Sequence, residues 1–293
     1  MNASDFVEHI NTRLDQTLSS QPWPCPKLAA SMHYAVCNGG KRSRATLSYL
    51  VGSGLGLELA ALEPIAMAIE CLHAYTLAHD DLPAMDDDDW RRGKPSCHRQ
   101  FGEATAILAG DALQAFALQL LAEAPISAEK KVAQLSYFSQ TVGAAGLCSG
   151  QSLDMSSQAD TCNLDDIYRI HHLKTGVLLG AACKLPGIAA NCNDEQLQKL
   201  QAFGEKLGLL LQINDDLIDM DTNTGKSAGK DAEQNKACIG NFLTNEKAKE
   251  LFKTVWAECN QLIEQLPTAS DSCKLHLKKY FLSDSSGLLR LMN

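Results

Sequence analysis

Aspartates are concentrated in one short stretch of the chain. Six of the ten residues in 80–89 are aspartates, and Arg91 and Arg92 follow directly. The apolar run before them predicts a helix over 64–81, which Pro83 cannot continue, so the acidic cluster falls at a helix C-terminus. The helix dipole is negative there and disfavours carboxylates. A divalent cation would compensate, and Mg²⁺ is typically bound by one or two carboxylates, water and a substrate phosphate.

A second acidic cluster, Asp215, Asp216 and Asp219, follows the apolar stretch 207–213. Asp215 and Asp219 are four residues apart and share a helix face, where like charges repel. A solvated acidic loop would explain one such cluster, since most charge runs are solvated. Two clusters, each at the end of an apolar helix, favour a shared metal site.

The elements that position these clusters are expected to be helices. Phe6, Ile10, Leu14 and Leu18 repeat every four residues and predict a helix over 3–20. No segment shows sustained period-two alternation, so the predicted fold is all-α, one helical-bundle domain over 1–293. The two clusters lie about 135 residues apart in the sequence, so their helices are expected to face one another across a bundle core.

Several helix boundaries are marked by capping residues. Pro64 suits the first position of the helix before the acidic cluster, and Asn163 and Asn193 each begin a capping signal. Further helices are expected over 104–123, 128–145, 163–176, 193–219, 246–265 and 271–282.

A basic segment follows two adjacent glycines, Gly39 and Gly40. Such glycines let the backbone approach a ligand, and Lys41, Arg42 and Arg44 could hold a phosphate. A capping turn with solvated cations would explain the segment as well. His73 lies seven residues before Asp80 on nearly the same helix face, and a structural role for it also stays open.

The motifs together resemble a known family. Asp80-Asp81-x-x-x-x-Asp86, Arg91-Arg92-Gly93 and Asp215-Asp216-x-x-Asp219 resemble the aspartate-rich motifs of the trans-prenyltransferases, the isoprenyl diphosphate synthases. The four-residue gap in the first motif is similar to bacterial farnesyl diphosphate synthases. The likeness runs from about Gly39 to Lys236. It departs at Ala45, where the family has proline, and around Lys236, where the family's Gly-Lys and Thr-Tyr-Pro frame is absent.

The resemblance implies an isoprenoid synthase-like helical bundle around a central cavity. It also implies a prenyl-transfer reaction. Isopentenyl diphosphate would condense head to tail with dimethylallyl and geranyl diphosphates, giving farnesyl diphosphate after Mg²⁺-assisted ionisation. Three Mg²⁺ ions would be held by Asp80, Asp81, Asp86, Asp215 and Asp219, and Arg91 and Lys174 complete the catalytic set. Isopentenyl diphosphate would be held by Lys41, Arg44, His73 and Arg92. The allylic diphosphate would be held by Arg91, Lys174, Thr175, Gln212, Lys226 and Lys236. Gln151 and Asp154 are candidates for a supporting role.

The sequence also offers candidates for the residues that limit the length of the product. Tyr75 and Thr76 lie about one turn before Asp80, where a growing hydrocarbon would extend away from the diphosphate. The resemblance implies that an aromatic here limits the product to fifteen carbons. A role for Tyr75 in packing alone stays open.

Composition restricts partners and compartment. A net charge of −9 argues against a general nucleic-acid binder. The sequence contains no run of 18 uncharged apolar residues, so no membrane span is predicted. Charged residues near the start argue against a secretory leader. Eleven cysteines without a Cys-x-x-Cys pair favour unbridged thiols in a reducing cytoplasm over a zinc site. The resemblance implies a homodimer that acts on small isoprenoid diphosphates.

Two alternatives stay open. A geranylgeranyl diphosphate synthase or a terpene cyclase would use related chemistry, although cyclases usually replace the second Asp-Asp-x-x-Asp motif. An inactive partner subunit that binds metal and diphosphate belongs to a different class. The altered frame around Lys236 is the feature that supports it.

Overall fold

The computed structural model describes residues 2–158, 160–220, 238–268 and 271–283, without the side chain of Asp219. Helices dominate, and two strands of two residues each form the one sheet in these residues, so the predicted all-α class is confirmed. The chain divides into two compact units, Met1–Tyr49 with Leu57–Leu135, and Leu50–Gly56 with Ser136–Asn293. Each unit is described by itself below.

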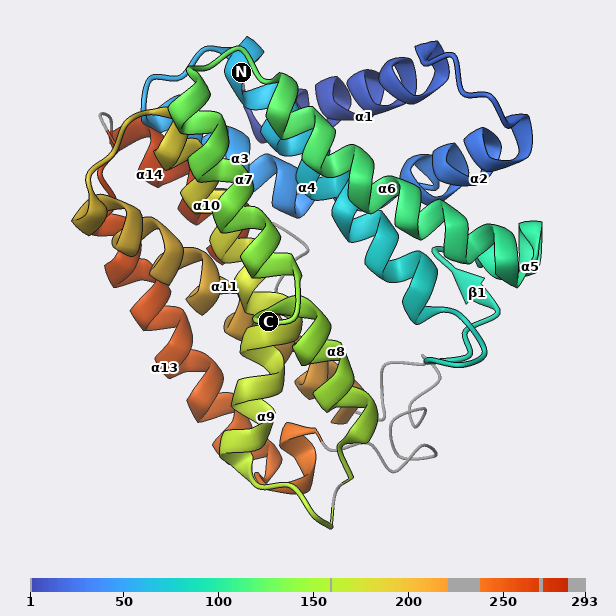
Figure 1. Cartoon of the computed structure of the whole chain (residues 1–293). Coiled ribbons are helices and arrows are strands. Elements are labelled where there is room, and N and C mark those ends of the chain that lie inside the picture. The colour runs from blue at the N-terminus through green and yellow to red at the C-terminus, as the bar shows by residue number, and fades with distance from the viewer. Residues whose placement is uncertain (1, 159, 221–237, 269–270, 284–293) are drawn as a thin grey trace. The chain divides into compact units, whose positions relative to one another are not determined.

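Unit 1 is built around α4, which packs against α6, α2 and α1. In Figure 1, α4 and α6 run side by side. Its elements are α1 (Ala3–Ser20), α2 (Pro26–Cys37), α4 (Leu59–Asp80), β1 (Trp90–Arg91), β2 (Lys94–Pro95), α5 (Cys97–Phe101) and α6 (Glu103–Glu123). Two further helices, α3 (Ser43–Gly54) and α7 (Ala128–Val142), contribute residues to both units.

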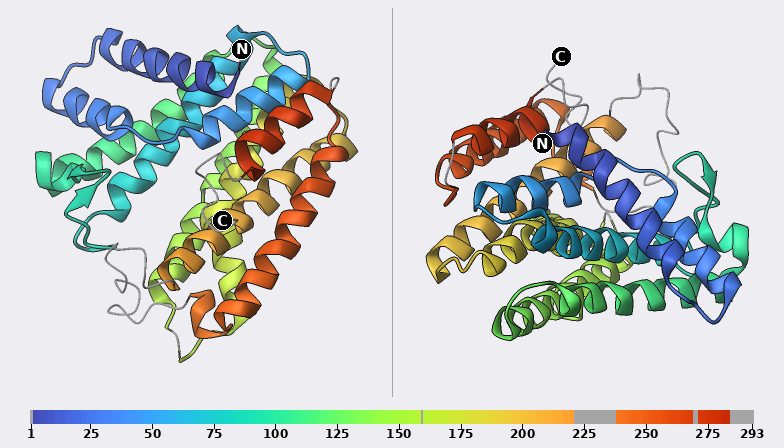
Figure 2. Two further views of the ribbon diagram at one scale, coloured as in Figure 1. Left: turned by 180° about the vertical axis from the view of Figure 1, so that it is seen from behind. Right: turned by 90° about the horizontal axis from the view of Figure 1, so that it is seen from above.

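Unit 2 is built around α11, which packs against α10 and α13; Figure 2 shows α11 and α13 side by side from behind. Its elements are α8 (Leu147–Ser156), α9 (Leu164–His171), η1 (His172–Gly176), α10 (Val177–Ala189), α11 (Asp194–Met220), η3 (Ile239–Asn241), α13 (Asn245–Glu264), α14 (Asp271–Leu277) and η4 (Lys278–Leu282). A Cβ on Gly208 of α11 would lie 2.6 Å from the Gly176 Cα, so this close helix contact requires glycine.

Most predicted helices are present, with some changed boundaries. The helix over 3–20 is confirmed, with its four apolar residues buried, and the capping bonds predicted at Asn163 and Asn193 are formed. The start predicted at Pro64 is wrong, because α4 begins at Leu59 and contains Pro64. A proline near a helix start removes only one backbone donor, and the apolar residues before it extend the helix. The helix expected to reach residue 145 ends at Val142.

The apolar character of α6 is explained by its position in unit 1. Among the described residues, α6 alone is long and apolar enough to cross a membrane by length and composition. Eight of its residues, from Ala106 to Leu121, are buried in unit 1, and a core helix has this same character.

Candidate active site

The first acidic cluster is shaped by backbone hydrogen bonds at the C-terminus of α4. The chain turns after Asp80, and the Asp86 N–H donates to the Asp80 carbonyl at 2.8 Å. The Asp88 N–H donates to the Asp81 carbonyl at 3.1 Å in the same turn. The prediction of an acidic helix C-terminus is therefore confirmed. The turn also explains the motif spacing, because it returns Asp86 to Asp80.

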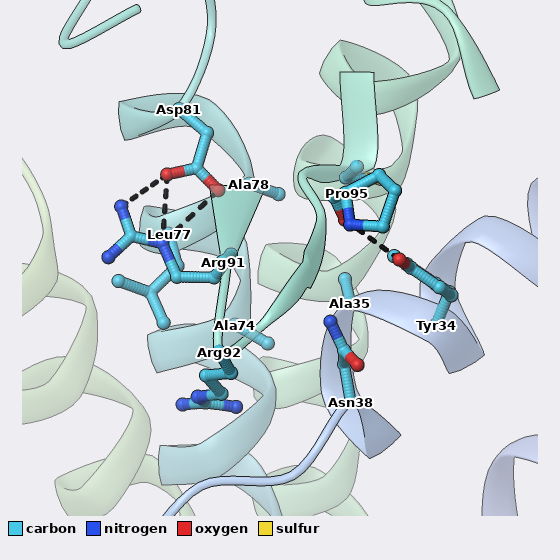
Figure 3. Close-up of a pocket in the computed structure, with 11 residues that line it drawn as sticks. Tyr34, Ala35, Asn38, Ala74, Leu77, Ala78, Asp81, Arg91, Arg92 and Pro95 are labelled. Atoms are coloured by element: carbon cyan, nitrogen blue, oxygen red, sulfur yellow. Dashed lines mark hydrogen bonds and ion pairs between the residues drawn. The ribbon is translucent and has the colours of Figure 1, made fainter. Parts of the chain in front are cut away.

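Asp81 differs from the other aspartates of the cluster because it is buried, and it is paired with Arg91. Only 2% of its side chain is exposed, and Arg91 Nε donates to Oδ1 at 2.9 Å while Nη2 also contacts this oxygen. Figure 3 shows the two side chains pointing toward one another. Burial raises the pKa of the Asp81 carboxyl, and the hydrogen bonds from Arg91 only partly offset that rise.

The arginines of the first motif are carried by a hairpin that the sequence did not predict. Trp90 pairs with Pro95 and Arg91 with Lys94, and Arg92 and Gly93 form the turn with φ of 53° and 75°. Positive φ at both central residues is typical of a tight two-residue hairpin turn. The turn directs Arg91 toward Asp81, while the Arg92 guanidinium donates to the Gly39 carbonyl.

The glycine segment and Arg92 approach one another closely. A Cβ on Gly40 would lie 2.6 Å from the Arg92 guanidinium carbon, and Gly40 has φ of 115°. A larger residue at Gly40 would therefore be strained and would displace Arg92. This agrees with the expectation that the adjacent glycines permit close approach.

His73 lies among the cations predicted to hold isopentenyl diphosphate. Arg44 Nη1 lies 3.3 Å from His73 Nε2, and burial lowers the pKa of His73 well below its ordinary value, with Arg44 and Arg92 adding to the effect. The imidazole is therefore neutral near pH 7 and contributes a hydrogen-bonding group without charge. Lys41 is exposed at the start of this segment.

Arg42, by contrast, is not available to a phosphate as the basic segment suggested. Its side chain is 3% exposed, and Nη1 donates to Glu70 Oε2 at 3.1 Å while Nη2 donates to the Val36 carbonyl at 2.7 Å. The other carboxylate oxygen of Glu70 accepts from the Ala45 N–H at 3.2 Å. A proline at position 45, as in the related motif, could not donate this bond.

A small cavity of about 20 Å³ adjoins Asp81 and the arginines, enough for about one water molecule. Tyr34 donates its hydroxyl to the Pro95 carbonyl at 2.7 Å beside it (Figure 3). The buried Oδ1 of Asn38 has no hydrogen-bond partner in the described part of the chain. Sequence reasoning missed Tyr34 and Asn38, because neither belongs to a motif with a chemical signature.

In unit 2, the second acidic cluster lies in the last turns of α11. Asp215 is exposed, whereas Asp216 accepts from the Ile239 N–H at 3.0 Å and lies 3.7 Å from His171 Nε2. The Asp216 carboxylate thus contacts η3 and α9, which agrees with its absence from the predicted set of metal ligands. Asp219 falls in the same helix.

The predicted allylic-site residues Lys174, Thr175 and Gln212 lie where η1 packs against α8 and α11. Lys174 Nζ lies 2.6 Å from Asp154 Oδ2, and Thr175 Oγ1 donates to Gln212 Oε1 at 2.7 Å. The structure therefore brings Asp154 to Lys174, as expected of a supporting residue. The buried amide of Gln151, from the same helix as Asp154, has no partner in the described residues.

Two predicted lysines, Lys226 and Lys236, lie outside the described residues. The carboxylates that the structure does describe fit a hard divalent cation. The Asp86–Asp80 backbone bond gathers oxygen donors at a helix end, and oxygen donors are the ligands that Mg²⁺ prefers.

Comparison with known proteins decides the family. The profile of the polyprenyl synthetase family matches residues 25–271. The chain belongs to the polyprenyl synthetase family. This family member is 42% identical over 274 residues to a farnesyl diphosphate synthase from Haemophilus influenzae, covering 88% of this chain and 92% of that protein. It is 38% identical to the farnesyl diphosphate synthase from Escherichia coli, covering 90% and 91% of the two chains.

Solved structures show the same likeness. A geranyltransferase from Legionella pneumophila matches this polyprenyl synthetase with a TM-score of 0.85 and 32% identity, covering 95% of each chain. A geranyltransferase from Helicobacter pylori complexed with magnesium and isoprenyl diphosphate matches with a TM-score of 0.81 and 30% identity, covering 95% of this chain and 96% of that one.

Proposed function

We propose that the protein is a farnesyl diphosphate synthase. It condenses isopentenyl diphosphate with dimethylallyl diphosphate and then with geranyl diphosphate. The observation that carries the proposal is that each acidic helix end has cations in its own unit. The first has Arg44 and Arg92, with neutral His73 beside Arg44, and the second lies on α11, against which the segment η1 with Lys174 packs. Farnesyl diphosphate synthases that share 38–42% of its sequence support the choice of product.

Carboxylates of the two acidic motifs would hold the metal. The proposed ligands are Asp80, Asp81, Asp86, Asp215 and Asp219, with three ions per active site. The magnesium complex of the related geranyltransferase supports the identity of the ion. When bound, Mg²⁺ neutralises the diphosphate and stabilises the charge that develops on it as the carbon–oxygen bond breaks.

The predicted binding residues divide between the two substrates. Lys41, Arg44, His73 and Arg92 would hold isopentenyl diphosphate and keep its alkene near the allylic carbon. Arg91, Lys174, Thr175, Gln212, Lys226 and Lys236 would hold the allylic diphosphate. Asp154 keeps Lys174 in place through the 2.6 Å contact, and the Thr175–Gln212 bond fixes the neighbouring turn. No protein nucleophile is required, because the alkene attacks the allylic cation and the departing pyrophosphate takes the proton that the condensed product loses.

The proposal also includes a homodimeric assembly and a location in the reducing cytoplasm. A homodimer is implied by the resemblance to the isoprenyl diphosphate synthases. All eleven cysteines lie in the described residues and none is in a disulfide, as a reducing cytoplasm would maintain them. Light scattering of the purified protein during size-exclusion chromatography would give the mass of a dimer, and a monomer mass would contradict this part of the proposal.

Release of pyrophosphate tests the proposed reaction. Purified protein supplied with dimethylallyl diphosphate, isopentenyl diphosphate and Mg²⁺ should release pyrophosphate as isopentenyl diphosphate is consumed. Exhaustive chelation should abolish the release, and restored Mg²⁺ should recover it. An inactive partner subunit would bind the substrates and release nothing, while undiminished turnover after chelation would contradict the role of the carboxylates.

A further inference from the structure

The hairpin formed by α1 and α2 brings together three side chains that the proposed reaction does not use. Asp15 lies on α1, and His33 and Cys37 are four residues apart on α2, so they share one helix face. One ligand atom from each lies within 4.8 Å of the other two. His33 Nε2 and Asp15 Oδ1 are already 2.7 Å apart. All three residues belong to unit 1.

These distances suit a tetrahedral metal ion. Zn²⁺ binds nitrogen and oxygen at about 2.0–2.2 Å and sulfur at about 2.3 Å, so its ligand atoms lie roughly 3.3–3.7 Å apart. The His33 Nε2–Asp15 Oδ1 distance of 2.7 Å is shorter than this spacing. The upper limit of 4.8 Å for the distances among all three ligand atoms is longer than it. Small side-chain rotations would suffice, because Asp15 and His33 are 61% and 37% exposed.

We propose that Asp15, His33 and Cys37 bind Zn²⁺ at a site that is independent of the acidic clusters. The donor set selects this metal, because one thiolate, one imidazole and one carboxylate match zinc, whereas Mg²⁺ requires oxygen ligands. Three protein ligands leave the fourth position for water or a small ligand. An open groove of about 410 Å³, lined by His33 with Trp23 and Pro26, gives access from solvent.

The protonation state of the Cys37 thiol without metal shows what zinc binding would change. Burial raises the pKa of the Cys37 thiol to about 11, Arg42 lowers it and the Asp15 carboxylate raises it. Cys37 is also the last residue of α2, where the helix dipole disfavours a thiolate. The thiol is therefore protonated near neutral pH. Binding replaces the thiol proton and releases it to solvent, and it requires that His33 Nε2 carry no proton.

Metal titration of the whole protein tests the site. Co²⁺ serves as a spectroscopic probe for zinc, with Mg²⁺ in large excess to occupy the carboxylate clusters. The wild type should take up one Co²⁺ per chain, with the near-ultraviolet absorption of a cobalt–thiolate bond, and Zn²⁺ should displace it. Zinc should also raise the thermal unfolding midpoint, because only the folded hairpin presents all three ligands.

Matched variants locate the binding. Cys37→Ser should lose the thiolate absorption, and His33→Asn should lose the metal, while both retain Mg²⁺-dependent condensation. Cys25→Ser is the control, because Cys25 is an exposed thiol directly before the same helix. Unchanged absorption in Cys37→Ser, or displacement of the bound ion by Mg²⁺, would overturn the proposal. His33 is partly exposed, so its variant decides the question even if Cys37→Ser folds poorly.

Discussion

At the scale of single residues, the 2.8 Å bond from the Asp86 N–H to the Asp80 carbonyl holds two acidic residues together at the negative end of α4. Each close pair of carboxylates costs roughly 1 kcal/mol in water and about 4 kcal/mol when partly buried. Arg91 pairs with Asp81 and Asp88, Arg99 pairs with Asp89, and a bound cation would add positive charge beside Asp80 and Asp86.

Removing one predicted ligand from either cluster should therefore be severe. Asp80→Ala and Asp215→Ala should each lower kcat by several orders of magnitude, because each removes stabilisation of the leaving diphosphate. Steady-state kinetics with saturating substrates measures this. Asp89→Ala is the control, since Asp89 is half exposed and pairs with Arg99. A loss of tenfold or less in the first two variants would mean that other carboxylates hold the metal.

The two sets of cations should separate in their kinetic effects. Arg44→Ala should mainly raise the KM for isopentenyl diphosphate, and Lys174→Ala should mainly affect the allylic substrate. Charge-assisted hydrogen bonds contribute roughly 1.5–3 kcal/mol, so changes of about tenfold to a hundredfold are expected. Lys199→Ala, which breaks only a surface pair with Glu195, should change neither constant. Equal effects of either site variant on both substrates would show that the assignment is wrong.

At the scale of elements, the buried pair of Arg42 and Glu70 joins the loop before α3 to α4. Glu70 is 3% exposed and accepts hydrogen bonds from Arg42 and from the Ala45 N–H. Its carboxylate therefore holds the chain on both sides of Arg44, directly after Lys41. The pair therefore helps to position Arg44, a predicted ligand of isopentenyl diphosphate.

Breaking this pair should cost far more than breaking a surface pair. Glu70→Ala should lower the free energy of unfolding by about 3–5 kcal/mol, because it leaves the Arg42 charge buried and unpaired. Urea unfolding measures the loss. Arg42→Met combined with Glu70→Leu should recover part of it, and Glu195→Ala, at an exposed pair, should change little. If Glu70→Ala and Glu195→Ala behave alike, the buried pair does not hold the loop.

Product length depends on α4 and its packing. Tyr75 packs edge-on against His79, with ring centroids 4.9 Å apart, and His79 is hydrogen-bonded to the Ile107 carbonyl of α6. Tyr75 is thus connected to α6 through His79, which would limit the movement of its ring when a hydrocarbon reaches it. Thr76 donates its hydroxyl to the His73 carbonyl one turn back.

Shortening Tyr75 should lengthen the product. Tyr75→Ala should yield products of twenty carbons or more, while the first condensation continues at nearly the normal rate. Chromatography of the dephosphorylated products measures the shift, with Tyr137→Ala as an aromatic control in α7. If Tyr75→Ala still stops at fifteen carbons, Tyr75 serves packing alone.

At the scale of the whole molecule, sequence periodicity and capping residues were enough to predict most of the helices. The spacing of Leu14 from the other apolar residues of α1 and the cap formed by Asn163 both involve residues a few positions away, so both could be recognised from the sequence. The Arg91–Arg92 hairpin was missed because two-residue strands show no alternation. The Arg42–Glu70 pair was missed because its partners are 28 residues apart and Glu70 lies within an apolar helix.

The residues of the candidate site also divide into those that sequence motifs predict and those that only the fold brings together. Asp80, Asp86 and Asp215 could be predicted as metal ligands from motif spacing, because the residues of each motif lie close together in the sequence. Asn38 and Tyr34 depend on chain folding that no spacing reveals. The facing arrangement of the two acidic motifs stays a prediction.

Identification of the product tests the central claim most directly. Purified protein is incubated with Mg²⁺, dimethylallyl diphosphate and excess isopentenyl diphosphate, and the products are resolved by chain length over time. The account predicts that a ten-carbon diphosphate appears first and is converted to a fifteen-carbon diphosphate, which accumulates. Accumulation of a twenty-carbon product, or no carbon–carbon bond formation at all, would contradict it.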